Sequence, residues 1–193
     1  VLVNGVDTRE LNLTEYFKHL SAVFQNEWIL SYTIAENVAM GKDWEKDRIW
    51  EALKLAKIDS VVKALPNGIF TYLGKGIDQN GVLLSGGELQ KLFWARALYR
   101  NPKLILLDEP TAALDALAED QLYQAYHKMT EKKSAMFISH RLASTRFCDT
   151  ILMLENGKIV ESGTHEELLA KKGSYAKLFE VQSRYYREGQ ENG

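Results

Sequence analysis

Short apolar runs alternate with amphipathic segments along most of this chain, a pattern typical of α/β folds. Runs that predict strands cover residues 21–25, 104–107 and 135–139, and the run 104–107 predicts a fully buried strand. Between the first two, residues 47–57 carry apolar side chains at helical spacing and predict an amphipathic helix. We therefore expect an α/β core into which a helix-rich segment is inserted.

Turn and capping signals predict where individual elements begin. Asn-Gly pairs at residues 4–5 and 156–157 predict tight turns, the second one a hairpin between residues 150–154 and 158–161. Three S/T-x-x-E capping boxes predict helix starts, formed by Thr33 with Glu36, Ser85 with Glu88, and Thr164 with Glu167. We expect a single final helix from Thr164 through Phe179, and a flexible tail over residues 187–193, where apolar content is low.

Composition narrows the possible functions. The 193 residues, 46% of them hydrophobic, suffice for one ordinary domain. A formal net charge of -2 provides no field that would attract nucleic acid, so we expect no nucleic-acid partner. Cys148, as the single cysteine, cannot form an internal disulfide, which fits a reducing cytosolic setting. No stretch approaches the ~20 apolar residues that span a bilayer, so we expect the chain as given to be soluble.

The segment LSGGELQK, residues 84–91, has the pattern of a phosphate-binding helix start. Ser85 is placed to cap the helix, and Glu88 completes the capping box. Gly86 and Gly87 allow backbone N–H groups to approach an anion closely. The pattern therefore predicts a helix N-terminus that contacts a phosphate.

The segment LILLDEPTAALD, residues 104–115, places two acids at the end of a buried strand. Asp108 and Glu109 follow four apolar residues, at the strand edge where α/β folds bind their ligands. Pro110 prevents the strand from continuing, and Asp115 is placed to cap the next helix. Two adjacent acids at this edge suggest a metal ligand and a base.

Together these two motifs resemble the ATP-binding cassette (ABC) ATPases, and the resemblance covers nearly the whole chain. It implies a P-loop NTPase-like (RecA-like) α/β core, about residues 1–33 and 92–186. A helical subdomain, about residues 34–91, is inserted in this core and includes the LSGGE signature. The segments TIAENV and GTHEELLAKKGSYAKLFEVQ resemble exporters in particular.

The resemblance implies ATP and Mg²⁺ as cofactors and gives roles to individual residues. Asp108 orients Mg²⁺, and Glu109 polarises the attacking water. His140, in the context SHR, contacts the γ-phosphate. Gln25, at the end of SAVFQ, reaches Mg²⁺ or the attacking water, and Asp115 belongs to the nucleotide-binding residues.

The same resemblance implies two protein partners. In this family the LSGGE segment, here with Ser85, Gly86, Gly87 and Glu88, binds a nucleotide held by a second cassette, so that two nucleotide-binding domains form a head-to-tail dimer. The loop over residues 26–31 contacts the transmembrane domain. We therefore expect the parent protein to be a membrane transporter whose ATPase lies at the cytoplasmic face of the plasma membrane.

The Walker A loop, G-x-x-x-x-G-K-[ST], does not occur in this sequence. Gly68, Gly74 and Lys75 miss the pattern, because five residues separate the two glycines and Gly76 stands where Ser or Thr must bind Mg²⁺. We expect an N-terminally truncated cassette that hydrolyses ATP in its parent protein and is inactive in isolation. Two explanations are open: the Walker A segment of the parent protein was removed, or the parent protein encodes a degenerate cassette. A soluble ABC ATPase without transport and a non-catalytic regulatory fragment are the alternatives.

Overall fold

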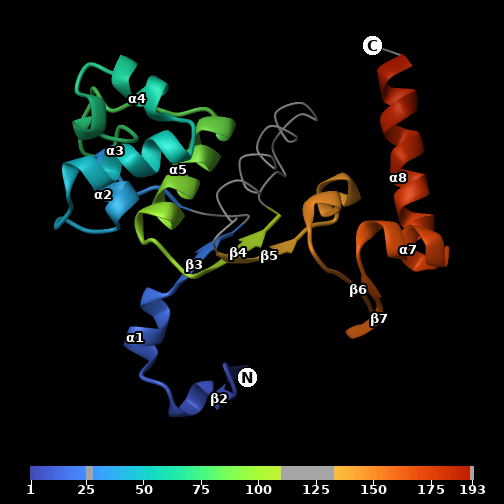
Figure 1. Ribbon diagram of the computed structural model, residues 1–193. Coiled ribbons are helices and arrows are strands. Elements are labelled where there is room, and N and C mark those ends of the chain that lie inside the picture. Colours follow the sequence, from blue (N-terminus) through green and yellow to red (C-terminus); the bar gives the residue numbers. More distant parts are fainter. Residues whose placement is uncertain (25–27, 110–132, 192–193) are drawn as a thin grey trace. The chain divides into compact units, whose positions relative to one another are not determined.

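The computed structural model describes residues 1–24, 28–109 and 133–191 (Figure 1). The chain divides into two units, Val1–Ile138 and Ser139–Gly193. Each unit has a hydrophobic core of its own. Gln25 and Asp115 lie outside the described residues. The finer division into an α/β core and a helical subdomain stays a prediction.

A parallel sheet of three strands is the centre of the first unit. Its order is β3 (Leu20–Val23), β4 (Leu104–Asp108) and β5 (Ser134–Ile138), and both pairs are parallel. These strands lie where the apolar runs predict them. In the central strand, Ile105 and Leu107 are buried. Because both pairs are parallel, the carboxyl ends of all three strands meet at one edge of the sheet.

Helices gather around α5 (Gly86–Tyr99), which packs against β3 and contributes the buried Trp94 to the core (Figure 1). The elements that surround it are α2 (Ile34–Ala39), α3 (Lys46–Leu55), α4 (Asp59–Ala64) and the 3-10 helix η2 (Gly68–Phe70). The bounds of α3 match the predicted amphipathic segment. The capping boxes predicted at the starts of α2 and α5 are both present.

The first residues form small elements outside this core. Strands β1 (Leu2–Val3) and β2 (Val6–Asp7) pair as a hairpin whose turn places Asn4 and Gly5 at positive φ. The 3-10 helix η1 (Thr8–Glu10) and helix α1 (Leu13–Lys18) follow, and the side chain of Asn12 caps α1. The predicted tight turn is therefore confirmed.

A buried amide holds the loop before α2. The side chain of Asn37 has no exposed surface, and its Nδ2 donates to the carbonyls of Leu30 at 2.9 Å, Tyr32 at 3.2 Å and Thr33 at 3.0 Å. Its Oδ1 accepts from the Leu30 N–H at 2.9 Å. The three carbonyls also accept backbone N–H groups, from Tyr32, Leu73 and Asn37 itself. The Asn37 side chain therefore adds a second donor to each of them and supplies the acceptor for the Leu30 N–H.

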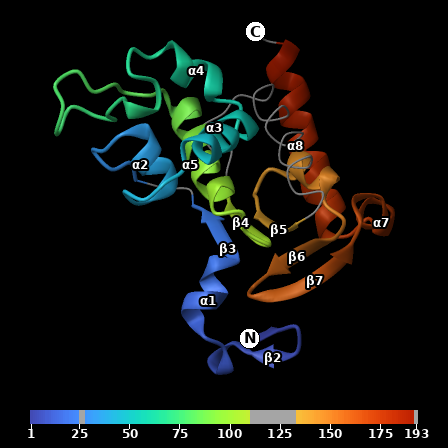
Figure 2. The same ribbon diagram turned by 60° about the vertical axis from the view of Figure 1, so that its left-hand side comes forward.

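The second unit begins with the 3-10 helix η3 (Leu142–Phe147). The antiparallel hairpin of β6 (Ile151–Glu155) and β7 (Lys158–Gly163) follows, and then come α7 (His165–Lys171) and α8 (Ser174–Glu191) (Figure 2). The predicted hairpin and the Thr164–Glu167 capping box are confirmed. In the described part of the chain, no helix combines the length and the apolar character that crossing a membrane requires.

The prediction of one continuous final helix is wrong. Helix α7 ends where Lys172 adopts the left-handed conformation with φ 53°, and α8 begins after Gly173. The carboxylate of Glu161 on β7 accepts from the N–H groups of Ser174 at 2.9 Å and Tyr175 at 3.0 Å, and a Cβ on Gly173 would collide with it. A carboxylate from a distant strand therefore starts α8 as a new helix.

The flexibility of the segment 187–193 stays a prediction, but its backbone is not irregular as far as it is described. Helix α8 continues through Glu191, so most of the segment 187–193 is helical. A helix that already has many turns can extend by adding one backbone hydrogen bond per residue, without a new nucleation step. Low apolar content was therefore not enough to end it.

A series of side-chain hydrogen bonds crosses the core of the second unit. Thr145 Oγ1 donates to the Leu142 carbonyl at 2.7 Å, so the 2.6 Å bond between Thr145 and Tyr175 uses the phenol proton. Tyr175 then has no proton left for His165 Nδ1, which lies 2.8 Å from the phenol oxygen. The proton must therefore sit on Nδ1 of His165, and the chain of donors runs from His165 through Tyr175 and Thr145 to Leu142.

Replacement of Asn37 by alanine is expected to destabilise the first unit by about 2 kcal/mol, because the Leu30 N–H loses its acceptor and the three carbonyls each lose one donor. Urea unfolding of the purified chain measures this loss. Lys18→Ala, which breaks an exposed pair with Glu15, is the control and should cost about 0.3 kcal/mol or less. Equal losses in the two variants would contradict the structural role of Asn37.

Acid is expected to destabilise the second unit through His165. Burial is the main cause that lowers the pKa of His165; Glu166 opposes this effect and Arg146 adds to it. The folded unit thus binds fewer protons than the unfolded chain, so its stability is complete above the unfolded-state pKa and falls as pH drops through that value. Thermal unfolding between about pH 7.5 and 5.5 should show a midpoint that falls with pH, and less steeply in His165→Phe. Identical slopes would contradict this prediction.

Candidate functional site

Two acids stand at the carboxyl end of the central strand of the sheet. Asp108 is the last residue of β4 and lies opposite Ile138 of β5. The N–H of Glu109 donates to the Ile138 carbonyl at 2.9 Å, which extends the ladder by one bond beyond the strand. Both acids are partly exposed. The structure thus places Asp108 and Glu109 at the sheet edge that the sequence predicts.

The backbone of Glu109 adopts the left-handed conformation, with φ 46°. Residues other than glycine adopt this region at a cost of about 1 kcal/mol, and such residues concentrate at functional sites. This conformation differs from that of a strand, so the strand geometry of β4 ends before Glu109. The sequence pattern gives no sign of it, because glutamate is not a residue that favours positive φ.

The start of α5 carries the predicted phosphate-binding segment. Ser85 is the N-cap: its Oγ accepts from the Glu88 N–H at 3.4 Å, while Glu88 Oε2 accepts from the Ser85 N–H and hydroxyl, both at 2.8 Å. Ser85 and Gly86 are exposed, and open space surrounds the Cα of Gly86. The first-turn N–H groups of Gly86 and Gly87 have no acceptor within the helix, so this helix end is suited to an anion.

The capping box also fixes the charge of Glu88. The Ser85 N–H, and then the Ser85 hydroxyl, lower the pKa of the Glu88 carboxyl, and Lys91 adds a smaller effect in the same direction. Because Glu88 stays ionised, its negative charge lies at the positive end of the helix dipole. The carboxylate therefore stabilises the helix start while the glycine amides stay open to a ligand.

His140 belongs to the second unit and lies two residues beyond the end of β5. Its carbonyl accepts a hydrogen bond of 2.6 Å from Gln182 Nε2 on α8. The structure therefore brings Asp108 and Glu109 together, and Ser85 and Glu88 together. The roles predicted for His140, Gln25 and Asp115 stay predictions.

Arg96 on α5 links the signature helix to the loop that follows Gln25, and the sequence analysis did not identify it. Its Nε donates to the Asn37 carbonyl at 3.0 Å, and both terminal nitrogens lie 3.3 Å from the Trp28 carbonyl. Trp28 itself is 82% exposed. A charged residue within the mostly buried run Trp94–Leu98 was the signal that could have identified Arg96.

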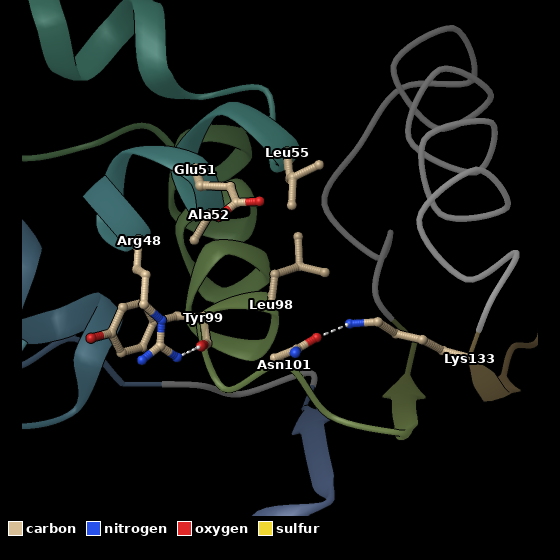
Figure 3. A pocket seen from close by; sticks show the side chains of 8 residues that line it. All are labelled: Arg48, Glu51, Ala52, Leu55, Leu98, Tyr99, Asn101 and Lys133. Atoms are coloured by element: carbon tan, nitrogen blue, oxygen red, sulfur yellow. Dashed lines mark hydrogen bonds between the residues drawn. The ribbon is translucent and has the colours of Figure 1, made fainter. Parts of the chain in front are cut away.

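A pocket of about 270 Å³ lies elsewhere in the first unit (Figure 3). Arg48 donates to the Tyr99 carbonyl at 3.0 Å there, and Lys133 donates to Asn101 Oδ1 at 3.0 Å. Burial lowers the pKa of Lys133. The lining residues are Arg48, Glu51, Ala52, Leu55, Leu98, Tyr99, Asn101 and Lys133. Since none of them is a predicted site residue, this pocket is separate from the candidate site.

A comparison with protein families decides between the classes that could use such a site. The model of the family described as ABC transporter matches residues 1–112, more than half of the chain. This chain belongs to the ABC transporter family. The signature helix and the two acids at the end of β4 both lie within the matched segment.

Individual members of the ABC transporter family match almost the whole chain. It is 41% identical over all 193 residues to ABC transporter B family member 13 of Arabidopsis thaliana, covering 15% of that protein. It is 39% identical over 181 residues, 94% of the chain, to an ATP-dependent lipid A-core flippase of Polaromonas, covering 30% of it. The chain thus spans less than a third of the length of these relatives.

A solved structure confirms the predicted fold class. The structure of a bacterial Atm1-family ABC exporter with ATP bound matches 94% of this chain with a TM-score of 0.83 and 34% sequence identity, over 31% of the exporter chain. The chain therefore has the P-loop NTPase fold of the nucleotide-binding domain of ABC exporters. The exporter-type resemblance of the sequence is confirmed as well.

Replacement of Glu88 by alanine is expected to cost about 1 kcal/mol of stability, because the Ser85 groups lose their acceptor. Glu88→Gln keeps an acceptor and should cost less than half of that. Since the folded-state pKa of Glu88 is lowered, the advantage of Glu over Gln is complete above the unfolded-state pKa and disappears as pH falls through the folded-state pKa. Urea unfolding at neutral pH and at about pH 4 tests both statements. A glutamine variant as unstable as the alanine variant would contradict them.

Proposed function

We propose that this chain is the nucleotide-binding part of an ABC exporter, in which ATP binding and hydrolysis drive the movement of a substrate across a membrane. The observation that carries the proposal is the Asp108–Glu109 pair at the end of the central strand, in a chain of this family. The exporters among its relatives and the matching Atm1-family structure support the direction of transport.

The residues at the sheet edge fit a magnesium nucleotide. Asp108 supplies a carboxylate oxygen, the type of ligand that Mg²⁺ prefers, and is partly exposed at the end of β4. When bound, the ion neutralises charge on the phosphates. Gln25 follows β3, the neighbouring strand, and is assigned to the same ion or to the attacking water.

Glu109 acts on the water in this proposal. Its carboxylate accepts a hydrogen bond from the water and directs the oxygen lone pair toward the γ-phosphate, so that the nucleophile is oriented before the reaction. The backbone bond to Ile138 holds the residue in place. His140 donates to the γ-phosphate and stabilises the charge that develops there. Asp115 contributes to nucleotide binding.

The LSGGE segment serves a second cassette. Its exposed helix start, with Ser85, Gly86 and Gly87, offers N–H groups and a hydroxyl to phosphate oxygens. In a head-to-tail dimer, each signature segment closes the nucleotide site of the other domain. The dimer thus forms around two ATP molecules and separates after hydrolysis.

The second protein partner is a transmembrane domain, which the loop over residues 26–31 contacts. This contact places the chain at the cytoplasmic face of a membrane. The exposed Trp28 lies in the loop that Asn37 and Arg96 hold in place. Movement of α5 on dimer closure is therefore transmitted through Arg96 to a loop that faces outward. The chain alone, without a Walker A loop in its sequence, is expected to bind MgATP too weakly for micromolar affinity in calorimetry.

Replacement of Glu109 by glutamine in the complete transporter is expected to reduce ATP turnover at least 100-fold and to accumulate the ATP-bound dimer, because glutamine cannot polarise the water. ATPase assays and size-exclusion chromatography with MgATP measure the two effects. Glu155→Gln, which removes an exposed acid on β6, is the control and should keep normal turnover. Undiminished turnover in Glu109→Gln would refute the role of Glu109.

A further inference from the structure

One side chain of α8 bridges two backbone groups around His140. Gln182 Nε2 donates to the His140 carbonyl at 2.6 Å, and Gln182 Oε1 accepts from the Leu142 N–H at 2.9 Å. The two bonded groups lie on either side of Arg141. Gln182 is 42 residues away from His140 in the sequence, so this is a tertiary contact and not part of a local turn.

The two hydrogen bonds define the orientation of the amide. If the amide were turned by 180°, Oε1 would face the His140 carbonyl oxygen and Nε2 would face the Leu142 N–H. Both contacts would then be repulsive. Among the neutral side chains of similar length, an amide alone offers a donor and an acceptor side by side. Glutamate keeps the shape but cannot donate when ionised, and methionine keeps the length without either bond.

The same turn is held from a second side. The Leu142 carbonyl accepts from Thr145, which is bonded in turn to the buried Tyr175 and through it to His165 on α7. Both polar backbone groups of Leu142 are thus tied to α7 and α8. The segment from His140 to Leu142 is therefore fixed by the C-terminal helices at both of its ends.

We propose that Gln182 is a positioning residue for His140, and this inference rests on the proposed function. Holding the carbonyl of His140 and the N–H of Leu142 fixes the peptide planes on both sides of Arg141. This sets the direction in which the Cα–Cβ bond of His140 leaves the backbone. A shift of about 1 Å in a group that contacts the transferred phosphoryl can lower the rate by up to 100-fold while substrate binding is preserved.

The test compares Gln182→Met and Gln182→Glu with His140→Ala in the complete transporter, reconstituted in membranes. If Gln182 positions His140, both Gln182 variants reduce kcat for ATP hydrolysis about tenfold, with KM for ATP unchanged within about twofold. Leu168→Val, which shortens a buried side chain in the core of the same unit, is the matched control. It should lower the midpoint of thermal unfolding by a few degrees at unchanged kcat.

The outcomes separate this inference from the proposed function. A large loss of kcat in His140→Ala with normal kcat in both Gln182 variants would overturn the positioning role and leave the proposed function standing. Normal turnover in His140→Ala would overturn the inference together with the role proposed for His140, whereas a complete transporter that does not hydrolyse ATP would overturn the proposed function. A loss of kcat in the Gln182 variants that Leu168→Val reproduces at equal loss of thermal stability would also overturn the inference, because it would show a general effect of unfolding.

Discussion

Burial of β4 between two parallel neighbours is the constraint on which the candidate site depends. Ile105 and Leu107 are almost fully buried, so a carboxylate at either position would lose its hydration without compensation. Asp108 and Glu109 stand at the carboxyl end of the strand and are partly exposed, so water and a bound ligand can reach them. Parallel pairing then brings the ends of β3 and β5 to the same edge. The chemistry of the site is thus confined to a line of strand ends.

Features that depend on neighbours in the sequence could be predicted. A capping box needs four consecutive residues and a short hydrogen bond, and all three predicted boxes are present. The strands β3, β4 and β5 coincide with the apolar runs, although Met136 and Ile138 of β5 are exposed in the described part of the chain. The Asn156-Gly157 turn follows from the ability of these two residues to adopt positive φ.

Features that depend on distant residues could not be predicted. The break before Ser174 requires Glu161, a strand residue that reaches the start of α8. The role of Arg96 requires the carbonyls of Asn37 and Trp28, which lie about 60 residues earlier. For the site, the position of Asp108 followed from strand burial, whereas the catalytic roles came from the family resemblance. Apolar spacing holds no information about these contacts.

The left-handed backbone at Glu109 has a consequence for how this position can vary in evolution. Local sterics favour glycine, asparagine or aspartate there, and disfavour β-branched residues strongly. A glutamate at position 109 therefore stands against the preference of its own backbone. If its carboxylate acts on the water as proposed, loss of that role would let the position drift toward glycine or asparagine, with a gain in stability. Under the proposed function, the residue at position 109 then records whether a lineage still depends on hydrolysis at this site.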